Sequence, residues 1–285
     1  MSLNNESDNT VTLGVVAISY NEERDLPGFI ANLQSWVDEI VIVDDGSTDS
    51  TEELAKAAGQ KVNFITSPRE DKEYFSHQRN KGIDAAKSDW LLHMDIDERV
   101  TPELAKEILE SVQNSEMDAY RYRRLNFFLH RPMKGGGWQD WNLVHLARRE
   151  VFRFGGMFHE DCIVDTPPER IGQLNSFMWH LNDDSYLERM RKSNLYCQEQ
   201  AENLQAKGLQ IRWWHFLILP SIEFLKKYFR RKGYRDGTPG LLFALHATSA
   251  RFKACALVWD TQNSISRSNI EEQVNNPFQT PTRDD

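Results

Sequence analysis

Two aspartates, Asp95 and Asp97, directly follow an apolar segment, residues 90–94, that is typical of a buried strand. Where a chain leaves a strand, two carboxylates two positions apart can converge on one hard divalent cation. Mg²⁺ and Mn²⁺ prefer such oxygen ligands, and phosphate oxygens of a substrate commonly complete the coordination. The pattern therefore predicts a Mg²⁺ or Mn²⁺ site that faces a phosphate-containing ligand. A pair of solvated loop acids is the alternative.

A second acidic cluster, Asp44 and Asp45 followed by Gly46, comes after the β-branched run 39–43. A carboxylate at a strand end can accept the imide N–H of a uracil ring or a ribose hydroxyl. Glycine lets the backbone approach a ligand closely. The cluster therefore favours a nucleoside site, and an Asp-Gly turn that caps the next helix is the alternative.

A third polar cluster, Tyr20, Asn21 and Glu22, follows the apolar run 13–19. The tyrosine supplies a ring to stack on a base, and its two neighbours supply further polar contacts. Taken alone the signal is weak, because Asn and Glu are common at helix starts. Beside two acidic strand ends, it favours the same nucleoside site.

The elements that position these clusters alternate along the first 112 residues. Apolar runs predict strands, and spacings of three and four predict helices between them. Strands are expected at 13–19, 39–43, 61–66 and 90–94, with helices beginning near residues 26, 51, 77 and 102. This order predicts an α/β protein with a mostly parallel sheet flanked by helices. Because ligands bind beyond the carboxyl ends of such strands, all three clusters fall at the expected site.

After residue 118 the pattern changes. Alternating residues predict strands at 119–124 and 143–148, and helical spacing follows at 185–206 and 212–232. We expect a flexible N-terminus, one main domain with a donor and an acceptor half, a helical membrane-associating extension and a flexible tail. Their limits are 1–11, 12–182 (halves 12–117 and 118–182), 183–265 and 266–285.

Three ordered motifs, VAISYNEERDLPGFI, EIVIVDDGSTDST and RNKGIDAAKSDWLLHMDIDERVTPEL, resemble family 2 glycosyltransferases of the GT-A fold. In the second half, GGGWQDW, GMFHEDCIV and YFRRKGYRDGTPGLLFAL resemble bacterial lipopolysaccharide-core glycosyltransferases of the WaaE/KdtX type. The resemblance implies an inverting, metal-dependent enzyme that moves a hexose from a nucleotide sugar, UDP-linked, onto a lipopolysaccharide-core or other membrane-associated glycan.

The resemblance also implies roles for single residues. Asp97 is expected to be the more direct metal ligand, with Asp95 beside it and His159 as a further candidate. Asn80 and Lys81 are expected near the diphosphate, although a solvated helix charge is an equal alternative for Lys81. The residues expected to bind the nucleotide sugar are Tyr20, Asn21, Glu22, Asp44, Asp45, Asn80, Lys81 and Asp95.

The catalytic base is expected in the run His159-Glu160-Asp161. Displacement at an anomeric carbon requires a carboxylate that takes the proton of the acceptor hydroxyl. The family's His-Glu pair makes Glu160 the first candidate and Asp161 the second. A solvated turn is the alternative for the whole run.

The resemblance places acceptor-binding residues at Trp138 and Asp140, and here the chain departs from its relatives. Their acid stands three residues after the tryptophan, whereas Asp140 stands two after it. An arginine in their next strand is replaced by His145, and the alanine between the two aspartates is replaced by Ile96. The acceptor side therefore differs more from the family than the donor side.

Charge is distributed unevenly along the chain. The formal net charge is −9, yet residues 207–260 contain ten Lys or Arg against three acids. Nucleic-acid binding by the acidic body is disfavoured because it requires a positive face. Aromatic and basic residues between 213 and 234 are typical of a helix at an anionic membrane surface, and a core helix with a basic solvent face is the alternative.

Three features of the sequence indicate the cellular location of the protein. Residues 1–10 do not resemble an export signal, and the apolar run 213–220 is far shorter than the roughly 20 residues that span a bilayer. Three scattered cysteines, Cys162, Cys197 and Cys255, read as packing residues in a reducing compartment. We expect a cytoplasmic protein, peripheral at the inner face of the cytoplasmic membrane.

Two rival functions use the same residues. The strand followed by Asp95 and Asp97 is similar to the nucleophile motif of haloacid-dehalogenase-like phosphatases, but that motif normally opens its fold. A non-catalytic membrane-associated glycan-binding protein would not need to keep the complete acidic set. Both are therefore less favoured than a glycosyltransferase.

Overall fold

The computed structural model describes residues 11–70, 73–155, 161–183 and 185–275. The chain forms two compact units. The first contains the chain up to Met133 together with Trp138–Asp184, and the second contains Lys134–Gly137 together with the chain from Ser185 onward. The domain limits expected from the sequence stay a prediction.

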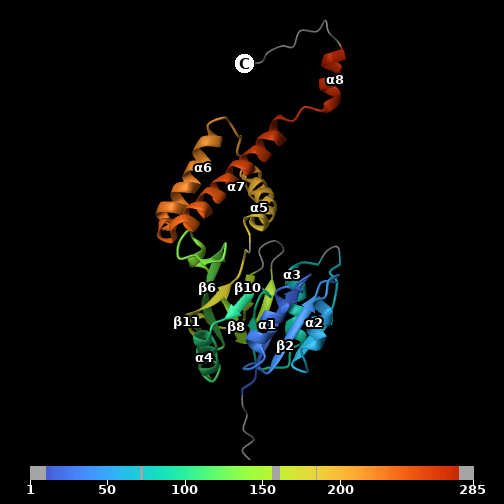
Figure 1. Ribbon diagram of the computed structural model, residues 1–285, viewed down its shortest axis with the longest axis vertical. Helices are drawn as coiled ribbons and strands as arrows, with labels where there is room; N and C mark the ends of the chain where they lie inside the picture. The colour runs from blue at the N-terminus through green and yellow to red at the C-terminus, as the bar shows by residue number, and fades with distance from the viewer. Residues whose placement is uncertain (1–10, 71–72, 156–160, 184, 276–285) are drawn as a thin grey trace, which may run out of the picture. The chain divides into compact units, whose positions relative to one another are not determined.

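The first unit begins with the predicted alternation of strands and helices, shown in blue to green in Figure 1. Its strands β3, β2, β1 and β4 lie side by side in that order, and all three pairings are parallel. The elements are β1 (Leu13–Ser19), α1 (Leu26–Leu33), β2 (Glu39–Asp44), α2 (Thr51–Ala57), β3 (Val62–Thr66), α3 (Phe75–Ala85), β4 (Trp90–His93) and α4 (Pro102–Ser111). The carboxyl ends of these strands therefore share one edge.

The sheet continues from β4 through β8, β6, β11 and β5, where antiparallel pairs enter. Strand β6 runs antiparallel to β8 and parallel to β11, while β5 runs antiparallel to β11. The bounds are β5 (Glu98–Val100), β6 (Ala119–Phe128), β7 (Arg131–Pro132), β8 (Asn142–Arg148), β9 (Phe152–Gly155), β10 (Asp161–Val164) and β11 (Ile171–His180). The short β5 joins the end of β11 to the loop that carries Asp97.

Alternating side chains of the central strands enter two different cores. Ile40 and Ile42 of β2 pack in one core with residues of α1 and α4, whereas Val41 packs in the other with Ile83 of α3. Successive side chains of a strand point to opposite faces, so a strand covered on both faces must be apolar throughout. This arrangement confirms the prediction of a sheet flanked by helices.

The second unit is helical: α5 (Tyr186–Ala206), α6 (His215–Leu225) with a π-helical continuation (Lys226–Arg230), α7 (Gly237–Asn263) and α8 (Arg267–Asn275). Its small core includes Ala201 of α5, Ile211, and Ala254 and Val258 of α7. At Gly240 a Cβ would lie 1.9 Å from the carbonyl oxygen of Gly233, so only glycine fits.

Helix α8 lies within the segment expected to be a flexible tail. The Oγ atom of Ser266 accepts the N–H of Asn269 at 3.2 Å, and Arg267 pairs with Glu271 one turn later at 2.8 Å. Such an N-terminal cap and an i,i+4 ion pair both favour a helix. The polar composition of this segment alone does not predict the cap and the ion pair.

One helix among the described residues, Gly233–Asn263, is long and apolar enough by length and composition to cross a membrane. Charged and polar residues interrupt its apolar residues, so no uninterrupted apolar run marks this helix in the sequence. In the most apolar window of this helix 39% is buried, and a core helix of a soluble protein passes the same test.

Candidate active site

The predicted acidic clusters lie at one edge of the sheet. Strands β2 and β4 are the two neighbours of β1, and Ser19 at the end of β1 is in register with Asp44. The N–H of Met94 donates to the carbonyl oxygen of Val16, so β4 ends near the same level. Both clusters therefore flank the end of β1.

Asp44 organises the turn after β2. Its side chain is buried and accepts hydrogen bonds from the hydroxyl of Ser19 at 2.8 Å and from the N–H groups of Gly46 and Ser47 at 2.9 and 2.7 Å. Gly46 has φ +83°, a conformation that favours glycine. These contacts form a turn after β2, but they do not cap the next helix, which begins at Thr51. The predicted contact of Asp44 with the nucleotide stays a prediction.

Asp45 pairs with an arginine that the sequence analysis missed. Its Oδ1 accepts the backbone N–H of Arg69 at 2.7 Å, and its Oδ2 accepts the Nε–H of the same residue at 2.7 Å. The guanidinium of Arg69 lies 3.9 Å above the ring of Phe75. Its position three residues after the strand 62–66, at the same sheet edge, was the available signal. The partly exposed Asp45 carboxylate is thus oriented rather than free.

The cluster after β1 is tied to the loop after β2. Asn21 has φ +56°, and its Oδ1 accepts the N–H of Thr48 at 2.8 Å. The N–H of Glu22 donates to the hydroxyl of Thr51 at 2.7 Å. The ring of Tyr20 is 56% exposed, which leaves a face that a base could cover. Whether these three residues contact a nucleotide stays a prediction.

Asn80 and Lys81 lie on α3. The Asn80 amide donates to the carbonyl oxygen of Phe154 and accepts its N–H, both at 2.9 Å, which ties α3 to β9. The Lys81 ammonium is 2.9 Å from a carboxylate oxygen of Glu73 and 3.1 Å from the hydroxyl of Ser67. Lys81 is therefore paired rather than merely solvated. The predicted proximity of both residues to a diphosphate is not tested.

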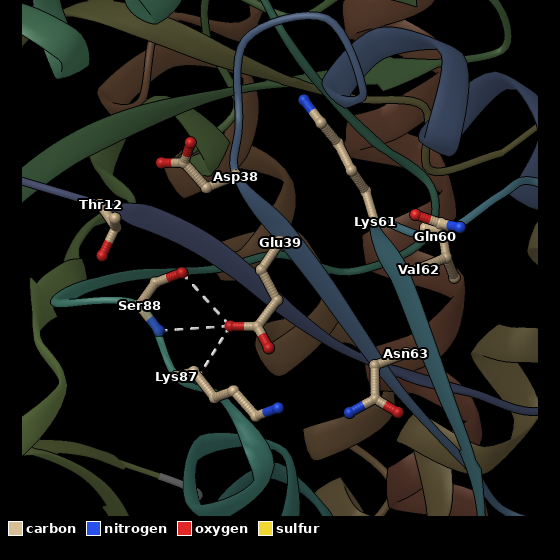
Figure 2. Close-up of a pocket in the computed structure, with 9 residues that line it drawn as sticks. All are labelled: Thr12, Asp38, Glu39, Gln60, Lys61, Val62, Asn63, Lys87 and Ser88. Carbon is tan, nitrogen blue, oxygen red and sulfur yellow. Dashed lines mark hydrogen bonds between the residues drawn. The ribbon is translucent and has the colours of Figure 1, made fainter.

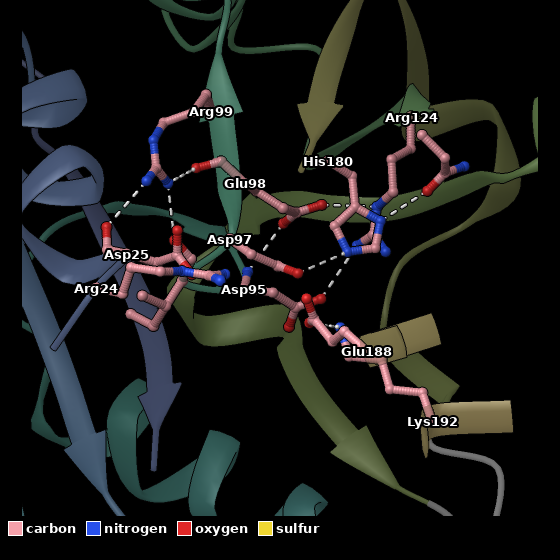
Figure 3. A network of polar contacts seen from close by, with 12 residues as sticks. Arg24, Asp25, Asp95, Asp97, Glu98, Arg99, Arg124, His180, Glu188 and Lys192 are labelled. Atoms are coloured by element: carbon pink, nitrogen blue, oxygen red, sulfur yellow. Dashed lines mark hydrogen bonds and ion pairs between the residues drawn. The ribbon is translucent and has the colours of Figure 1, made fainter. Parts of the chain in front are cut away.

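Asp95 lies in a network with arginines (Figure 3). The Nη2 atom of Arg124, on β6, is 3.3 Å from Oδ2 of Asp95, and its Nε is 2.6 Å from Oε1 of Glu98. The fully buried Glu98 in turn accepts the N–H of Asp95 at 2.9 Å. Arg79 of α3 lies 3.7 Å from the other oxygen of Asp95. The first aspartate is therefore held between two cations.

These neighbours shift the pKa values of the acids in opposite directions. Burial alone would raise the pKa of Asp95, but the positive charge of Arg124, with smaller contributions from His93, Arg79 and His180, holds it well below its usual range. For Glu98 burial dominates and raises the pKa to about 7, against the opposing charge of Arg124. Asp95 is thus ionised throughout the neutral range.

His145, which replaces the arginine of the relatives, does not supply a cation. It is buried beside His93, with ring centroids 5.2 Å apart, and burial lowers its pKa to about 3. Arg124 provides the positive charge instead, with its guanidinium 4.1 Å above the ring of Trp141. The positive charge near Asp95 therefore comes from β6 and α3 rather than from β8.

Asp97 pairs with a histidine from β11 that the sequence analysis also missed. The Nε2 atom of His180 is 3.1 Å from Oδ2 of Asp97 (Figure 3). The Nδ1 atom of His180 is 2.7 Å from Oδ1 of Asn126. Across residues 11–70, 73–155, 161–183 and 185–275, no group of three or more His, Cys, Asp or Glu side chains is arranged to hold a metal. One carboxylate and one imidazole still suit a divalent cation whose other ligands come from phosphate and water.

The candidates for base and acceptor binding are described only in part. His159 and Glu160 lie outside the described residues, and Asp161 opens β10 with its side chain outside them. Trp138 and Asp140 form a 3-10 turn. The side-chain amide of Asn126 donates to the carbonyl oxygen of Trp138 at 3.2 Å, so this turn is tied to the residue that orients His180.

A polar pocket of 580 Å³ lies at the opposite ends of the strands, at the starts of β1, β2, β3 and β4 (Figure 2). Its carboxylate Glu39 accepts N–H groups from Lys87 and Ser88, at 2.8 and 3.2 Å. Lys61 donates to the carbonyl oxygens of Gln34 and Val37. These groups hold the sheet ends together, so the pocket is not our candidate for the active site.

The first unit is an α/β fold in which a parallel half, with acids at the carboxyl ends of its strands, is followed by a mixed half. Residues 14–162 match the model of the glycosyl transferase family 2, which is more than half of the chain. The chain therefore belongs to this family and is a glycosyltransferase. The matched range includes Asp95 and Asp97, so the phosphatase alternative is not favoured.

Relatives of known name extend over nearly the whole chain. It is 26% identical over 270 residues to the lipopolysaccharide core biosynthesis glycosyltransferase LpsC of Rhizobium meliloti, covering 92% of this chain and 97% of LpsC. It is also 26% identical over 245 residues to the uncharacterized glycosyltransferase RT0209 of Rickettsia typhi, covering 82% of each. Among solved structures, S. aureus TarS 1–349 is similar with 14% identity and a TM-score of 0.44, over 90% of this chain and 93% of that one.

These findings confirm two predictions. The fold class, a GT-A α/β sheet flanked by helices with a C-terminal helical extension, agrees with the strand order and the family. The resemblance to lipopolysaccharide-core enzymes agrees with LpsC.

Proposed function

We propose that the chain is an inverting, metal-dependent hexosyltransferase that uses a UDP-sugar donor and a lipopolysaccharide-core or other membrane-associated glycan acceptor. The observation that supports this best is the pairing of Asp97 with His180 at the sheet edge where Asp45 is oriented by Arg69. A divalent-cation site and a nucleoside site would then share one edge. The name of LpsC supports the class of acceptor.

Asp97 and His180 would hold the cation, because Asp95 is already paired with Arg124 and Arg79. Imidazole beside carboxylate suits Mn²⁺ better than Mg²⁺, which strongly prefers oxygen ligands. When bound, the ion would neutralise charge on the departing diphosphate. The largely buried guanidinium groups beside Asp95 would add positive charge at the same edge.

On the donor side, the Asp45 carboxylate would accept the imide N–H of uracil, and Tyr20 would stack on the base. Asn21, Glu22 and Asp44 would shape the loops around the nucleoside through the contacts described above. Asn80 and Lys81 would border the diphosphate. On the acceptor side, Glu160, or Asp161 one residue later, would take the proton of the attacking hydroxyl, with Trp138 and Asp140 near the glycan. One direct displacement inverts the anomeric configuration.

Donor binding and stereochemistry test the proposal together. A panel of UDP-, GDP-, ADP- and CMP-sugars with Mn²⁺ should give thermal stabilisation for a UDP-hexose alone, worth about 2.7 kcal/mol at a hundredfold excess over the dissociation constant. Transfer to a lipopolysaccharide-core acceptor should yield the anomer opposite to that of the donor by NMR. Full transfer in excess EDTA, or retention of configuration, would contradict the mechanism.

A further inference from the structure

Helix α6 presents an apolar stripe that its own unit leaves uncovered. Ile218, Ile222, Leu225 and Phe229 follow one another at spacings of four, three and four, and are 49%, 53%, 53% and 56% exposed. Residues so spaced lie on one helix face, which in a globular protein normally packs against the core. Here a different face packs inward, through residues such as Phe216, whose ring lies 5.6 Å from that of Phe252 on α7. The helix is therefore apolar on two faces.

Cations border this stripe. Lys226 and Arg230 lie one residue after Leu225 and Phe229, and both are exposed. Lys232 and Arg235 follow, also exposed. The single acid between residues 212 and 235, Glu223, is largely covered and lies 3.8 Å from the Lys226 ammonium and 4.0 Å from Arg251. The surface around the stripe is thus positive on a chain whose net charge is −9.

The combination of apolar and basic residues favours one occupant. A two-fold contact with a second copy would cover the stripe but would bring the bordering cations no anionic partner. An anionic bilayer satisfies both parts of the surface, because the stripe enters the acyl boundary while the cations meet lipid phosphates. The exposed rings Trp213 and Tyr234, 72% and 51% exposed, stand at the two ends, as aromatic residues do at membrane interfaces.

We propose that α6 and its π-helical continuation form a docking surface for an anionic lipid bilayer and lie in the plane of the interface. The stripe from Ile218 to Phe229 rises only about 18 Å, less than the roughly 30 Å of a bilayer core, so it cannot span. Side chains of α7 such as Phe243, Ala254 and Val258 are buried in packing, so α7 is not free on all sides as a lone spanning helix would be. The docking surface itself is argued from α6 alone. Only its role, which is to bring the enzyme to a membrane-bound acceptor, rests on the proposed function.

Vesicle flotation of the full chain tests the proposal with three variants. The first replaces the stripe by Ile218→Ser, Ile222→Ser, Leu225→Ser and Phe229→Ser. The second replaces the bordering cations by Lys226→Gln, Arg230→Gln, Lys232→Gln and Arg235→Gln. The matched control replaces four similarly exposed residues of the first unit by Leu109→Ser, Leu143→Ser, Ile163→Ser and Phe177→Ser.

The wild type and the control should float with vesicles that contain one third phosphatidylglycerol and stay with the soluble fraction when vesicles are purely phosphatidylcholine. Both α6 variants should partition at least about tenfold more weakly. The cation variant should also lose the salt dependence of binding, and carbonate should extract the wild type. Circular dichroism of each variant should match the wild type.

Several outcomes would overturn the proposal: undiminished flotation of the stripe variant, equal binding to neutral vesicles, resistance to carbonate, or a stripe variant that changes only the oligomeric state. Thermal stabilisation by a UDP-sugar separates the two proposals. If the wild type floats without binding any nucleotide sugar, the proposed function fails and the docking surface stands. If it binds donor and never floats, the docking surface alone fails.

Discussion

The Nε2 atom of His180 lies 3.1 Å from Oδ2 of Asp97, although 83 positions separate the two residues. The antiparallel pairing of β11 with β5, in which His180 is opposite Glu98, brings them together. Asp95 lies beside the guanidinium groups of Arg124 and Arg79. Asp97, the second aspartate of the pair, lies beside the imidazole of His180 instead. The two carboxylates, which look alike as a sequence pattern, therefore have different partners.

The first prediction follows from that difference. Asp97→Ala should reduce transfer more than about 100-fold, because a metal contributes several kcal/mol to stabilising a leaving group. His180→Ala should weaken Mn²⁺ binding in calorimetry with UDP present, and Asp97→Ala should abolish it. Asp84→Ala, which removes an exposed carboxylate of α3, is the control and should change neither quantity. Unchanged Mn²⁺ affinity in both site variants would refute the assignment.

The second prediction concerns the nucleoside. Asp45→Ala should raise the KM for the donor at least about tenfold with little change in kcat, since a base contact made equally in ground and transition states affects mainly binding. Arg69→Ala should do the same more weakly, because it removes the residue that orients Asp45 and leaves the carboxylate in place. Steady-state kinetics at saturating acceptor measure both. A fall in kcat with unchanged donor affinity would count against the role.

The third prediction concerns the base. Glu160→Gln should leave donor binding near normal and reduce kcat by roughly 10²–10⁴, the usual contribution of a positioned general base. Asp161→Asn is the matched neighbour and should retain most of the rate. If instead the Asp161 variant loses activity while the Glu160 variant keeps it, the base moves by one residue.

Features set by residues close together in the sequence could be predicted, whereas contacts between segments far apart in the sequence could not. The parallel strands and their acidic ends could be predicted, because apolar runs and strand-end acids are local patterns. Neither Arg124 nor His180 could be placed beside them, since each arrives through strand pairing over a long separation, and β5 has only three residues.

Sequence patterns also cannot distinguish two adjacent residues of the same type when the backbone conformation alone decides which side chain points inward. Asp44 and Asp45 are equivalent in the sequence, and only the turn at Gly46 decides that the first carboxylate faces inward. Helix α7 could not be predicted from the sequence for a different reason. Gly, Ala and Ser alternate with its large apolar residues on all sides, so no single stripe stands out.

The last prediction tests how β6 and β11 are held in register, since they carry Arg124 and His180. Asp118 and Arg170 stand one residue before these strands. The N–H of Asp118 donates to the carbonyl oxygen of Arg170, and Nη2 of Arg170 donates to Oδ1 of Asp118 at 2.6 Å. The Thr166 hydroxyl donates to Oδ2 at 2.6 Å. The hydrogen bond from Arg170 chiefly lowers the pKa of Asp118 from 3.8 to about 2.

A carboxyl group whose pKa is lower in the folded state stabilises the fold above its unfolded pKa, and this stability is lost as pH falls through the folded value. Asp118→Asn should therefore lower the free energy of unfolding by about 1 kcal/mol at pH 7, a figure that allows for solvent around this surface pair. The deficit relative to the wild type should shrink between about pH 4 and pH 2. Urea unfolding of both proteins at several pH values measures it, with Asp84→Asn, an exposed partner of Arg153, as the control that should change stability by less than about 0.5 kcal/mol. An equal deficit at pH 7 and pH 2 would show that the Asp118 charge does not hold the two strands in place.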